Sequence, residues 1–263
     1  MIPRAYITEW QKNAPWRINA QVEQDLIIER ALIELFSDEL INQSLAFRGG
    51  TALHKIFLPP QVRYSEDIDL VQIEEGEIGA ILTRIRKILG FLDKKPRFNR
   101  SIHNNTLVFR FNSEIEPIQP LKLKVEINCR EHFSVLGWIS VNHSIESSYF
   151  SGETKIVSYK LEELLGTKLR ALYQRRKGRD LFDLHYALKM IKPNNEDILS
   201  CYHKYMEFSD GKTKTAKEFI INMDEKMQDD VFLGDMTALL RPEVEFNMDE
   251  AYDLVKKELI DKI

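Results

Sequence analysis

Cysteine and long apolar runs are both scarce in this sequence. Its 263 residues include only two cysteines, Cys129 and Cys201, which lie far apart and form no CxxC or other metal-binding spacing. No apolar run approaches the ~18 residues that a membrane span requires. The opening segment, MIPRAYITEWQKNAPW, lacks the apolar core of a signal peptide. We therefore expect a cytoplasmic protein with reduced thiols and without structural zinc.

An excess of positive charge is missing as well. The formal net charge is −4, which argues against nucleic-acid binding through bulk positive charge but leaves room for a local basic cleft. The hydrophobic content of 43% is enough to build a proper core. The length allows one large domain or two modest ones.

The hydrophobic pattern changes once along the chain. Before residue 160, segments with helical spacing (21–41 and 77–90) alternate with strand-like segments. Strands are expected at 44–47, 67–73, 106–112, 121–129 and 154–159. From Leu161 onward, nearly every segment has helical spacing. The pattern predicts an α+β protein, with a mixed β-sheet flanked by helices over residues 1–160 and a helical bundle over residues 161–263.

The segment RYSEDIDLVQI places two carboxylates at the start of a strand-like run. Residues i and i+2 of a strand point to the same face, so Asp67 and Asp69 project side by side. Two anions this close repel each other and raise at least one pKa unless a cation lies between them. The pair is therefore suited to a hard divalent metal such as Mg2+. The alternative is an exposed strand edge whose acids discourage aggregation.

The segment FRGGTALHKIF places two glycines between a strand and a helix. Gly49 and Gly50 permit a tight turn and a close approach of the backbone to a ligand. The N–H groups that follow, at Thr51 and Ala52, lie at a helix N-terminus and predict a phosphate site. The Thr51 hydroxyl can donate to that phosphate or cap the helix. Lys55, one turn further on, is either a phosphate contact or a solvated charge, and the solvated charge is the stronger interpretation.

A basic run interrupts the otherwise acidic helical part. Six basic residues crowd into TKLRALYQRRKGRDLFDL: Lys168, Arg170, Arg175, Arg176, Lys177 and Arg179. Such a local reversal of charge predicts attraction of an anion, either a triphosphate or an RNA backbone. Two structural alternatives remain open: Asp180 caps a helix, or Arg179 and Asp183 form a buried ion pair.

The order of these motifs resembles a known group of enzymes. A strand, a GGT turn, a helix and then an Asp-x-Asp strand resemble the nucleotidyltransferase fold of the polymerase-β-like superfamily. More narrowly, GGTALHK, SEDIDL, KVEIN and KLRALYQRRKGRDLFDL together resemble the AbiEii/AbiGii toxin family. That family comprises nucleotidyltransferase-like toxins of bacterial abortive-infection and type IV toxin–antitoxin systems. The resemblance covers residues 40–190.

The resemblance implies roles for individual residues. Asp67 and Asp69 match the metal-binding pair, and Glu126 in KVEIN is the candidate for the third carboxylate, with a Glu where many relatives have Asp. Ser65 matches a small polar position before the pair, where it contacts phosphate or caps the strand. Lys168 and Asp180 match positions implied in activity. Nucleotide binding is then expected from the following set: Gly49, Gly50, Thr51, Ser65 and Lys168.

The implied activity is transfer of a nucleoside monophosphate from an NTP to an RNA acceptor, tRNA above all. Mg2+ or Mn2+ is the implied cofactor, and an antitoxin encoded nearby is the implied partner, with or without direct contact. Two alternatives stay open: an inactive nucleotidyltransferase fold that binds nucleotide or RNA without turnover, and an enzyme that modifies a small molecule such as an antibiotic.

Overall fold

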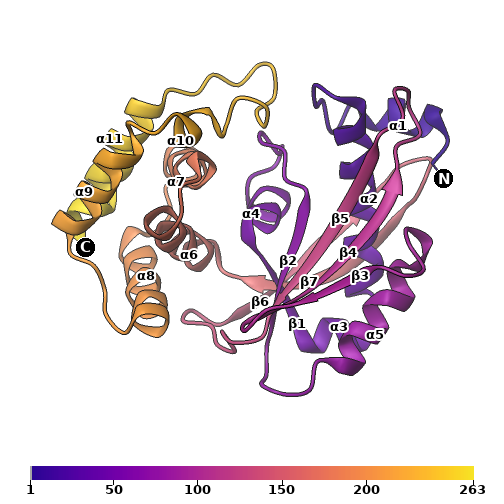
Figure 1. Cartoon of the computed structure of the whole chain (residues 1–263), viewed down its shortest axis with the longest axis horizontal. Coiled ribbons are helices and arrows are strands. Elements are labelled where there is room, and N and C mark those ends of the chain that lie inside the picture. The colour runs from indigo at the N-terminus through magenta and orange to yellow at the C-terminus, as the bar shows by residue number, and fades with distance from the viewer. Residues whose placement is uncertain (1) are drawn as a thin grey trace. The chain divides into compact units, whose positions relative to one another are not determined.

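The computed structural model describes residues 2–263 and divides them into two compact units. The first unit contains the chain up to Phe133 together with Trp138–Tyr159. The second contains Ser134–Gly137 and Lys160–Ile263. Figure 1 shows the course of the chain through both units.

The first unit is built on a mixed seven-stranded sheet of order β3-β4-β5-β2-β1-β7-β6. The pairs β2–β5 and β1–β7 are parallel and the other neighbours are antiparallel. The strands are β1 (Leu45–Arg48), β2 (Asp67–Gln72), β3 (Arg97–Arg100), β4 (Asn104–Asn112), β5 (Pro120–Asn128), β6 (Trp138–Ile145) and β7 (Gly152–Tyr159). All five predicted strands are confirmed, and β3 and β6 are additional.

Helices line the apolar face of this sheet. The face carries alternate, fully buried residues such as Ile68, Leu123 and Val125. Phe36 near the end of α2 packs on Phe47 of β1, with ring centroids 6.3 Å apart. The helices of this unit are α1 (Arg4–Trp10), α2 (Asn19–Phe36), α3 (Glu39–Ser44), α4 (Gly49–Ala52) with its π-helical continuation Leu53–Phe57, and α5 (Gly79–Ile88) (Figure 1).

The predicted helix over residues 21–41 is interrupted. The structure ends α2 at Phe36 and begins α3 at Glu39. The cause is Asp38, whose side chain accepts a hydrogen bond from the Ile41 N–H at 3.2 Å and so caps a new helix. The hydrophobic spacing continues across the break, which is why the sequence pattern suggested one helix.

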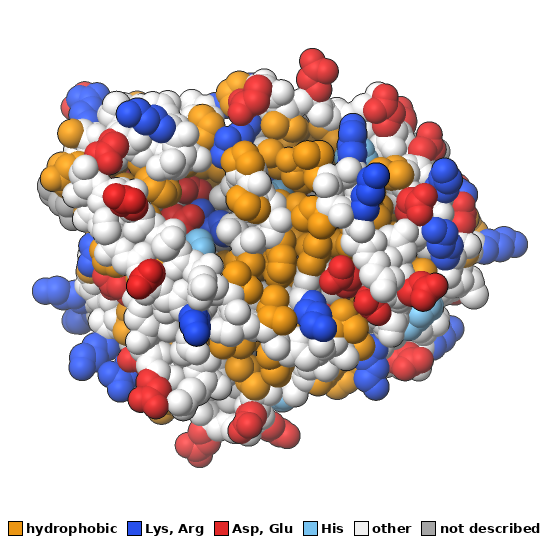
Figure 2. Space-filling model, turned by 180° about the vertical axis from the view of Figure 1, so that it is seen from behind, with side chains coloured by type: hydrophobic (Ala, Val, Ile, Leu, Met, Phe, Trp, Pro, Cys, Tyr) orange, Lys and Arg blue, Asp and Glu red, His pale blue; other side chains and the backbone are white. Residues whose placement is uncertain are grey.

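The second unit is helical. Its helices are α6 (Leu161–Gln174), α7 (Gly178–Met190), α8 (Asn195–Asp210), α9 (Ala216–Lys226), α10 (Asp230–Gly234) and α11 (Met248–Glu258). The segment Ser134–Gly137 belongs to this unit because Glu163 of α6 accepts hydrogen bonds from Ser134 Oγ and from the N–H groups of Val135 and Leu136. Acidic and basic side chains are interspersed on the face shown in Figure 2. Within residues 2–263, every helix is too short or too polar to cross a membrane.

Candidate active site

The centre of the candidate site is the polar face of β2 and β5. Because the strands run parallel, Asp67 lies beside Lys124, and Asp69 lies beside Glu126. Paired residues on neighbouring strands share a face of the sheet. The register therefore brings the three predicted carboxylates to one face, opposite the buried Ile68 and Leu70.

The charged form of Asp67 is disfavoured at this position. Burial and the neighbouring Asp69 raise the pKa of Asp67 to about 6, although Lys124 acts in the opposite direction. The Lys124 ammonium lies 4.0 Å from an Asp67 oxygen but only 2.7 Å from a Glu126 oxygen. One lysine thus neutralises mainly Glu126. A further cation beside Asp67 would therefore stabilise its charged form.

Glu126 is held by two partners. Besides the ion pair with Lys124, its other oxygen accepts a hydrogen bond from Asn104 Nδ2 of β4 at 2.9 Å. Within residues 2–263, no group of three or more Asp, Glu, His or Cys side chains forms a metal cluster. Mg2+ needs only one or two protein carboxylates when substrate phosphates complete its shell. Asp67 and Asp69 fit that requirement, whereas Glu126 fits it only when Lys124 releases it.

The glycine turn packs directly against Asp69. Gly49 has φ +80°, and a Cβ at this position would overlap the Asp69 carboxylate. Both facts require glycine, because an L-residue is strained at positive φ and the space for a side chain is filled. Gly50 follows as the second residue of α4. The turn therefore places the first N–H groups of α4 next to a carboxylate of the strand.

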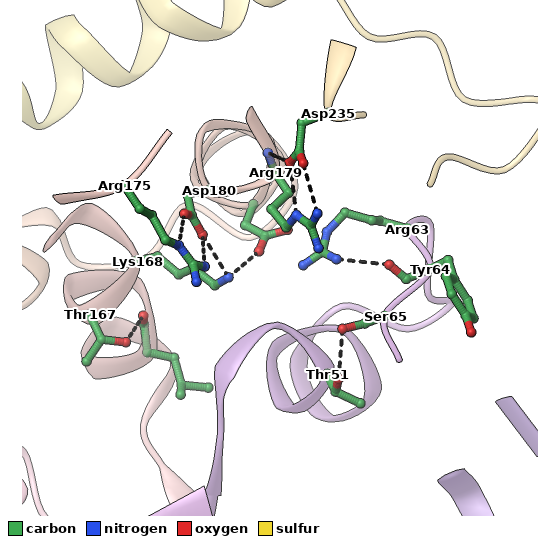
Figure 3. Close-up of polar contacts among 12 residues, drawn as sticks. Thr51, Arg63, Tyr64, Ser65, Thr167, Lys168, Arg175, Arg179, Asp180 and Asp235 are labelled. Atoms are coloured by element: carbon green, nitrogen blue, oxygen red, sulfur yellow. Dashed lines mark hydrogen bonds and ion pairs between the residues drawn. The ribbon is translucent and has the colours of Figure 1, made fainter. Parts of the chain in front are cut away.

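Thr51 and Ser65 connect the turn to the strand. Thr51 Oγ1 donates to the carbonyl oxygen of Asp67 at 2.5 Å and lies 2.7 Å from Ser65 Oγ (Figure 3). Since the single hydroxyl proton of Thr51 is used on Asp67, Ser65 is the donor to Thr51. The structure thus shows Thr51 fixing the backbone of Asp67, where the sequence suggested a phosphate donor or a helix cap.

Lys55 differs from both interpretations of the sequence, because it is neither solvated nor available to a phosphate. It is buried between Asp25 at 3.0 Å and Glu29 at 2.8 Å, both on α2. Burial alone would lower the pKa of Lys55, but the two carboxylates raise it. Trp10 Nε1 donates to Asp25, and His143 Nε2 lies 2.7 Å from Glu29. This network ties the π-helical continuation of α4 to α2.

The second unit holds the other predicted residues in a buried cluster. Lys168 of α6 lies 3.1 Å from Asp180 and 2.9 Å from Asp183, both on α7 and both fully buried. Arg175 adds two hydrogen bonds to Asp180, at 2.6 and 2.8 Å (Figure 3). Burial would raise the pKa of Asp180, but Lys168 and Arg175 lower it. Asp180 therefore accepts from two cations and does not use its side chain as a cap.

Most of the basic run is neutralised within the second unit. Arg176 pairs with Asp229 at 2.8 Å, and Arg179 pairs with Asp235 through two hydrogen bonds of 2.9 and 2.8 Å. Lys177 also lies 3.7 Å from Asp235. The suggested ion pair between Arg179 and Asp183 is wrong. The acids that neutralise the run come from the segment around α10, about fifty residues further along the chain.

Sequence reasoning overlooked Lys124 as a part of the site. Its ammonium joins Glu126 to the neighbourhood of Asp67. The alternation in LKLKVEIN did carry a signal, because it places Lys124 and Glu126 on one strand face. The parallel register with β2 could not be obtained from that pattern.

Comparison with known proteins agrees with this architecture. The sequence matches a family described as nucleotidyl transferase AbiEii toxin, type IV toxin–antitoxin system, over residues 30–258. No curated protein matches at a significant level. Among solved structures, MenT4, a nucleotidyltransferase toxin from Mycobacterium tuberculosis, has TM-score 0.64 and 15% identity, with 98% of this chain and 88% of that chain covered. JHP933 from Helicobacter pylori has TM-score 0.55 and 21% identity, with 92% of each chain covered. These two likenesses concern the fold.

A mixed sheet with an Asp-x-Asp strand beside a glycine turn defines a nucleotidyltransferase fold, as predicted. Since the family match spans most of the chain, the resemblance found in the sequence is confirmed. The chain belongs to the AbiEii family of toxin nucleotidyltransferases and is an enzyme of that class.

Proposed function

We propose that this protein transfers a nucleoside monophosphate from an NTP to an RNA, with tRNA as the favoured acceptor, in a metal-dependent reaction. The observation that carries the proposal is the Asp67–Asp69 pair itself: burial and Asp69 raise the pKa of Asp67 to about 6, and Asp69 packs against the Gly49 turn. A protein that only bound nucleotide would need the turn and positive charge. Paired acids would repel such a ligand unless a cation were bound between them.

Asp67 and Asp69 are the proposed metal ligands. Bound there, Mg2+ or Mn2+ would orient the α-phosphate of the NTP and neutralise charge on the leaving pyrophosphate. Glu126 is the proposed third acid. It ligates the metal or accepts the proton of the acceptor hydroxyl after Lys124 has released it.

The remaining residues bind and position the nucleotide. The backbone of Gly49 and Gly50 provides the phosphate-binding turn, and the hydroxyls of Thr51 and Ser65 fix that turn to Asp67. Lys168 is proposed to attract the outer phosphates. Asp180, 3.1 Å from the Lys168 ammonium, would hold that side chain in position.

The two parts of the chain would have different roles in the reaction. Residues 1–160 form the nucleotidyltransferase-like domain with the aspartate pair, and residues 161–263 form the helical domain with Lys168. We place the reaction in the cytoplasm, where NTP, Mg2+ and tRNA occur together. An antitoxin encoded nearby would limit the toxic activity, with or without direct contact.

The test is incorporation of labelled NTP into total bacterial tRNA in the presence of Mg2+. Each of the four NTPs is tried in turn, and pyrophosphate release is measured in parallel. Asp67→Asn should abolish incorporation, and Glu74→Gln, which removes an exposed acid beyond the same strand, should leave it unchanged. RNA binding that persists in EDTA without any incorporation would instead identify a binding module. Labelling of a small acceptor but not of RNA would identify an antibiotic-modifying enzyme.

A further inference from the structure

A second, larger surplus of positive charge lies in the first unit. Residues 94–130 contain eight Lys or Arg and three Glu, in a chain whose net charge is −4. This segment covers β3, β4 and β5, which form one end of the sheet. It differs from the run at 168–179 because intramolecular ion pairs do not neutralise it to the same extent.

The register places four of these basic residues, Arg97, Arg110, Lys122 and Lys124, on the face that carries the aspartates. Lys124 lies beside Asp67, and in the same row Val108 of β4 and Arg97 of β3 follow. In the next row, Lys122 lies beside Arg110. With strands about 4.8 Å apart, the row from β2 to β3 extends about 14 Å from Asp67. This is a distance over which a nucleic-acid strand presents several phosphates.

Two of the cations on this face are Arg110 and Lys122. Both side chains are exposed, and within residues 2–263 neither forms an ion pair. The Lys122 charge nevertheless acts on Asp67. An open pocket of about 600 Å3 lies where β4 ends and β5 begins, and Arg110, Lys122, Phe111 and Glu66 line it. The pocket thus places two cations that form no ion pair next to Glu66, the residue that precedes Asp67, while Phe111 lines it from the opposite face of β4.

We propose that this pocket binds the backbone of the acceptor RNA, with Arg110 and Lys122 on a phosphodiester. Contacts to a phosphodiester hold the RNA strand in position and carry no base preference. Bound in this way, the strand lies on the face of the sheet that presents Asp67 and Asp69. The inference rests on the proposed function, since it identifies the surface that holds the acceptor.

The experiment measures the binding of total bacterial tRNA in EDTA without NTP, as a function of salt. In the double variant Arg110→Gln/Lys122→Gln, affinity should fall about tenfold or more. The slope of log affinity against log salt should become shallower by about 1.4, which corresponds to two single-strand phosphate contacts. The control is Lys12→Gln/Lys87→Gln, which removes the same charge from two exposed lysines outside the sheet, one in the turn after α1 and one on α5. Its affinity should stay within twofold of the wild type.

The outcomes separate this inference from the proposed reaction. Wild-type affinity and salt slope in the Arg110/Lys122 variant would overturn the acceptor surface and leave the transferase intact. Equal losses of RNA affinity in both double variants would show that bulk charge, and not this pocket, attracts RNA. That result would also overturn the acceptor surface. Conversely, the tRNA binding could depend on Arg110 and Lys122 while no NTP is incorporated. That result would refute the proposed reaction and support the RNA-binding surface. Melting temperatures of all variants should match, since the four side chains are exposed.

Discussion

At the scale of single residues, the site is defined by repulsion between two neighbouring carboxylates. Asp69 and burial raise the pKa of Asp67 to about 6, and Lys124, 4.0 Å from Asp67, lies closer to Glu126. A folded protein tolerates such repulsion at a cost in stability. The cost is recovered when a cation binds, so it should be measurable in the metal-free protein.

The first prediction concerns Asp67→Asn in EDTA. The pKa of Asp67 is about 6 in the folded state and 3.8 in the ordinary reference state, so folded protein holds the proton more tightly. Wild-type stability is therefore lost as pH rises from about 4 to 6. The variant, which has no such charge, should be more stable at pH 7.5 by on the order of 1 kcal/mol, a value reduced for solvent screening. At pH 3.5 the difference should vanish.

Urea denaturation at the two pH values measures this difference. Glu74→Gln, in an exposed position, is the control and should show no pH-dependent gain. A variant that is destabilised at pH 7.5 would show instead that Asp67 contributes to a structural ion pair.

The second prediction concerns the hydroxyl of Thr51. Thr51→Val keeps the shape but removes the donor to the Asp67 carbonyl, which leaves a buried acceptor unpaired. We expect a loss of about 1–2 kcal/mol in stability and a clear loss of turnover through displacement of Asp67. Thr51→Ser retains the donor and should keep most of both. Equal behaviour of the two variants would show that the methyl group, and not the hydrogen bond, matters.

At the scale of elements, the turn between β1 and α4 is the critical connection. It has to bring helical N–H groups next to the aspartates and still leave space for the Asp69 carboxylate. The network of Lys55 then fixes the continuation of α4 to α2. Turn and network act together, because a displaced helix would move the N–H groups away from the strand.

The third prediction is that Gly49→Ala inactivates the enzyme. The added methyl group overlaps Asp69, and the residue is strained at φ +80°. Strain of this kind costs about 1–2 kcal/mol, and displacement of Asp69 should reduce NTP turnover at least a hundredfold. Gly79→Ala is the matched control, because nothing lies within 4 Å of its added Cβ. Turnover by both variants is compared under the same conditions, and equal, near-native rates would refute the close packing of turn and strand.

The fourth prediction is that Lys55→Met destabilises the first unit. It leaves Asp25 and Glu29 as neighbouring buried anions, and loss of one partner of a buried ion pair costs about 3–5 kcal/mol. The pKa of Glu29 is about 2, held down by Lys55 and His143 against the effect of burial. In the wild type, the contribution of Glu29 is present above its ordinary pKa of 4.5 and is lost as pH falls toward 2.

The difference between Lys55→Met and the wild type should therefore shrink on acidification from pH 6 to pH 3, as followed by chemical denaturation. Lys87→Met, at an exposed position of α5, is the control and should change stability by less than about 0.5 kcal/mol. A Lys55→Met protein of native stability would show that a solvated lysine was the correct interpretation after all.

At the scale of the whole molecule, the fold class and the aspartate pair could be predicted from the sequence, because both depend on local periodicity. The five predicted strands have a buried face that alternation reveals. The two that were overlooked, β3 and β6, are the edges of the sheet. The residues of β3 are exposed, and β6 alternates half-buried with exposed residues, so neither has the fully buried face of the inner strands.

The ion pairs between distant segments could not be predicted from local sequence patterns. The basic run at 168–179 looked like an anion site, but Asp229 and Asp235 lie about fifty residues away in sequence and neutralise much of it. The role of Lys55 depends in the same way on α2, although Asp25 and Glu29 are spaced i, i+4 on that helix. Tertiary contacts decide which charged side chains remain available to a ligand. In the structure, Arg110 and Lys122 of the sheet remain available.

The last prediction asks whether the second unit takes part in nucleotide binding. If Lys168 attracts the outer phosphates, Lys168→Ala should weaken binding of an NTP tenfold or more, about 1.4 kcal/mol, and affect the monophosphate little. Because Lys168 balances two buried acids, the variant also loses stability. Lys226→Ala is a suitable control, since that buried lysine donates to the carbonyls of Leu172 and Tyr173 and has no proposed ligand role. General destabilisation should reduce binding of both nucleotides equally in either variant. Only a selective loss of triphosphate affinity in Lys168→Ala, measured by calorimetry with ATP and AMP below the melting temperature, supports a phosphate contact. An equal loss identifies Lys168 as a structural cation of the helical unit.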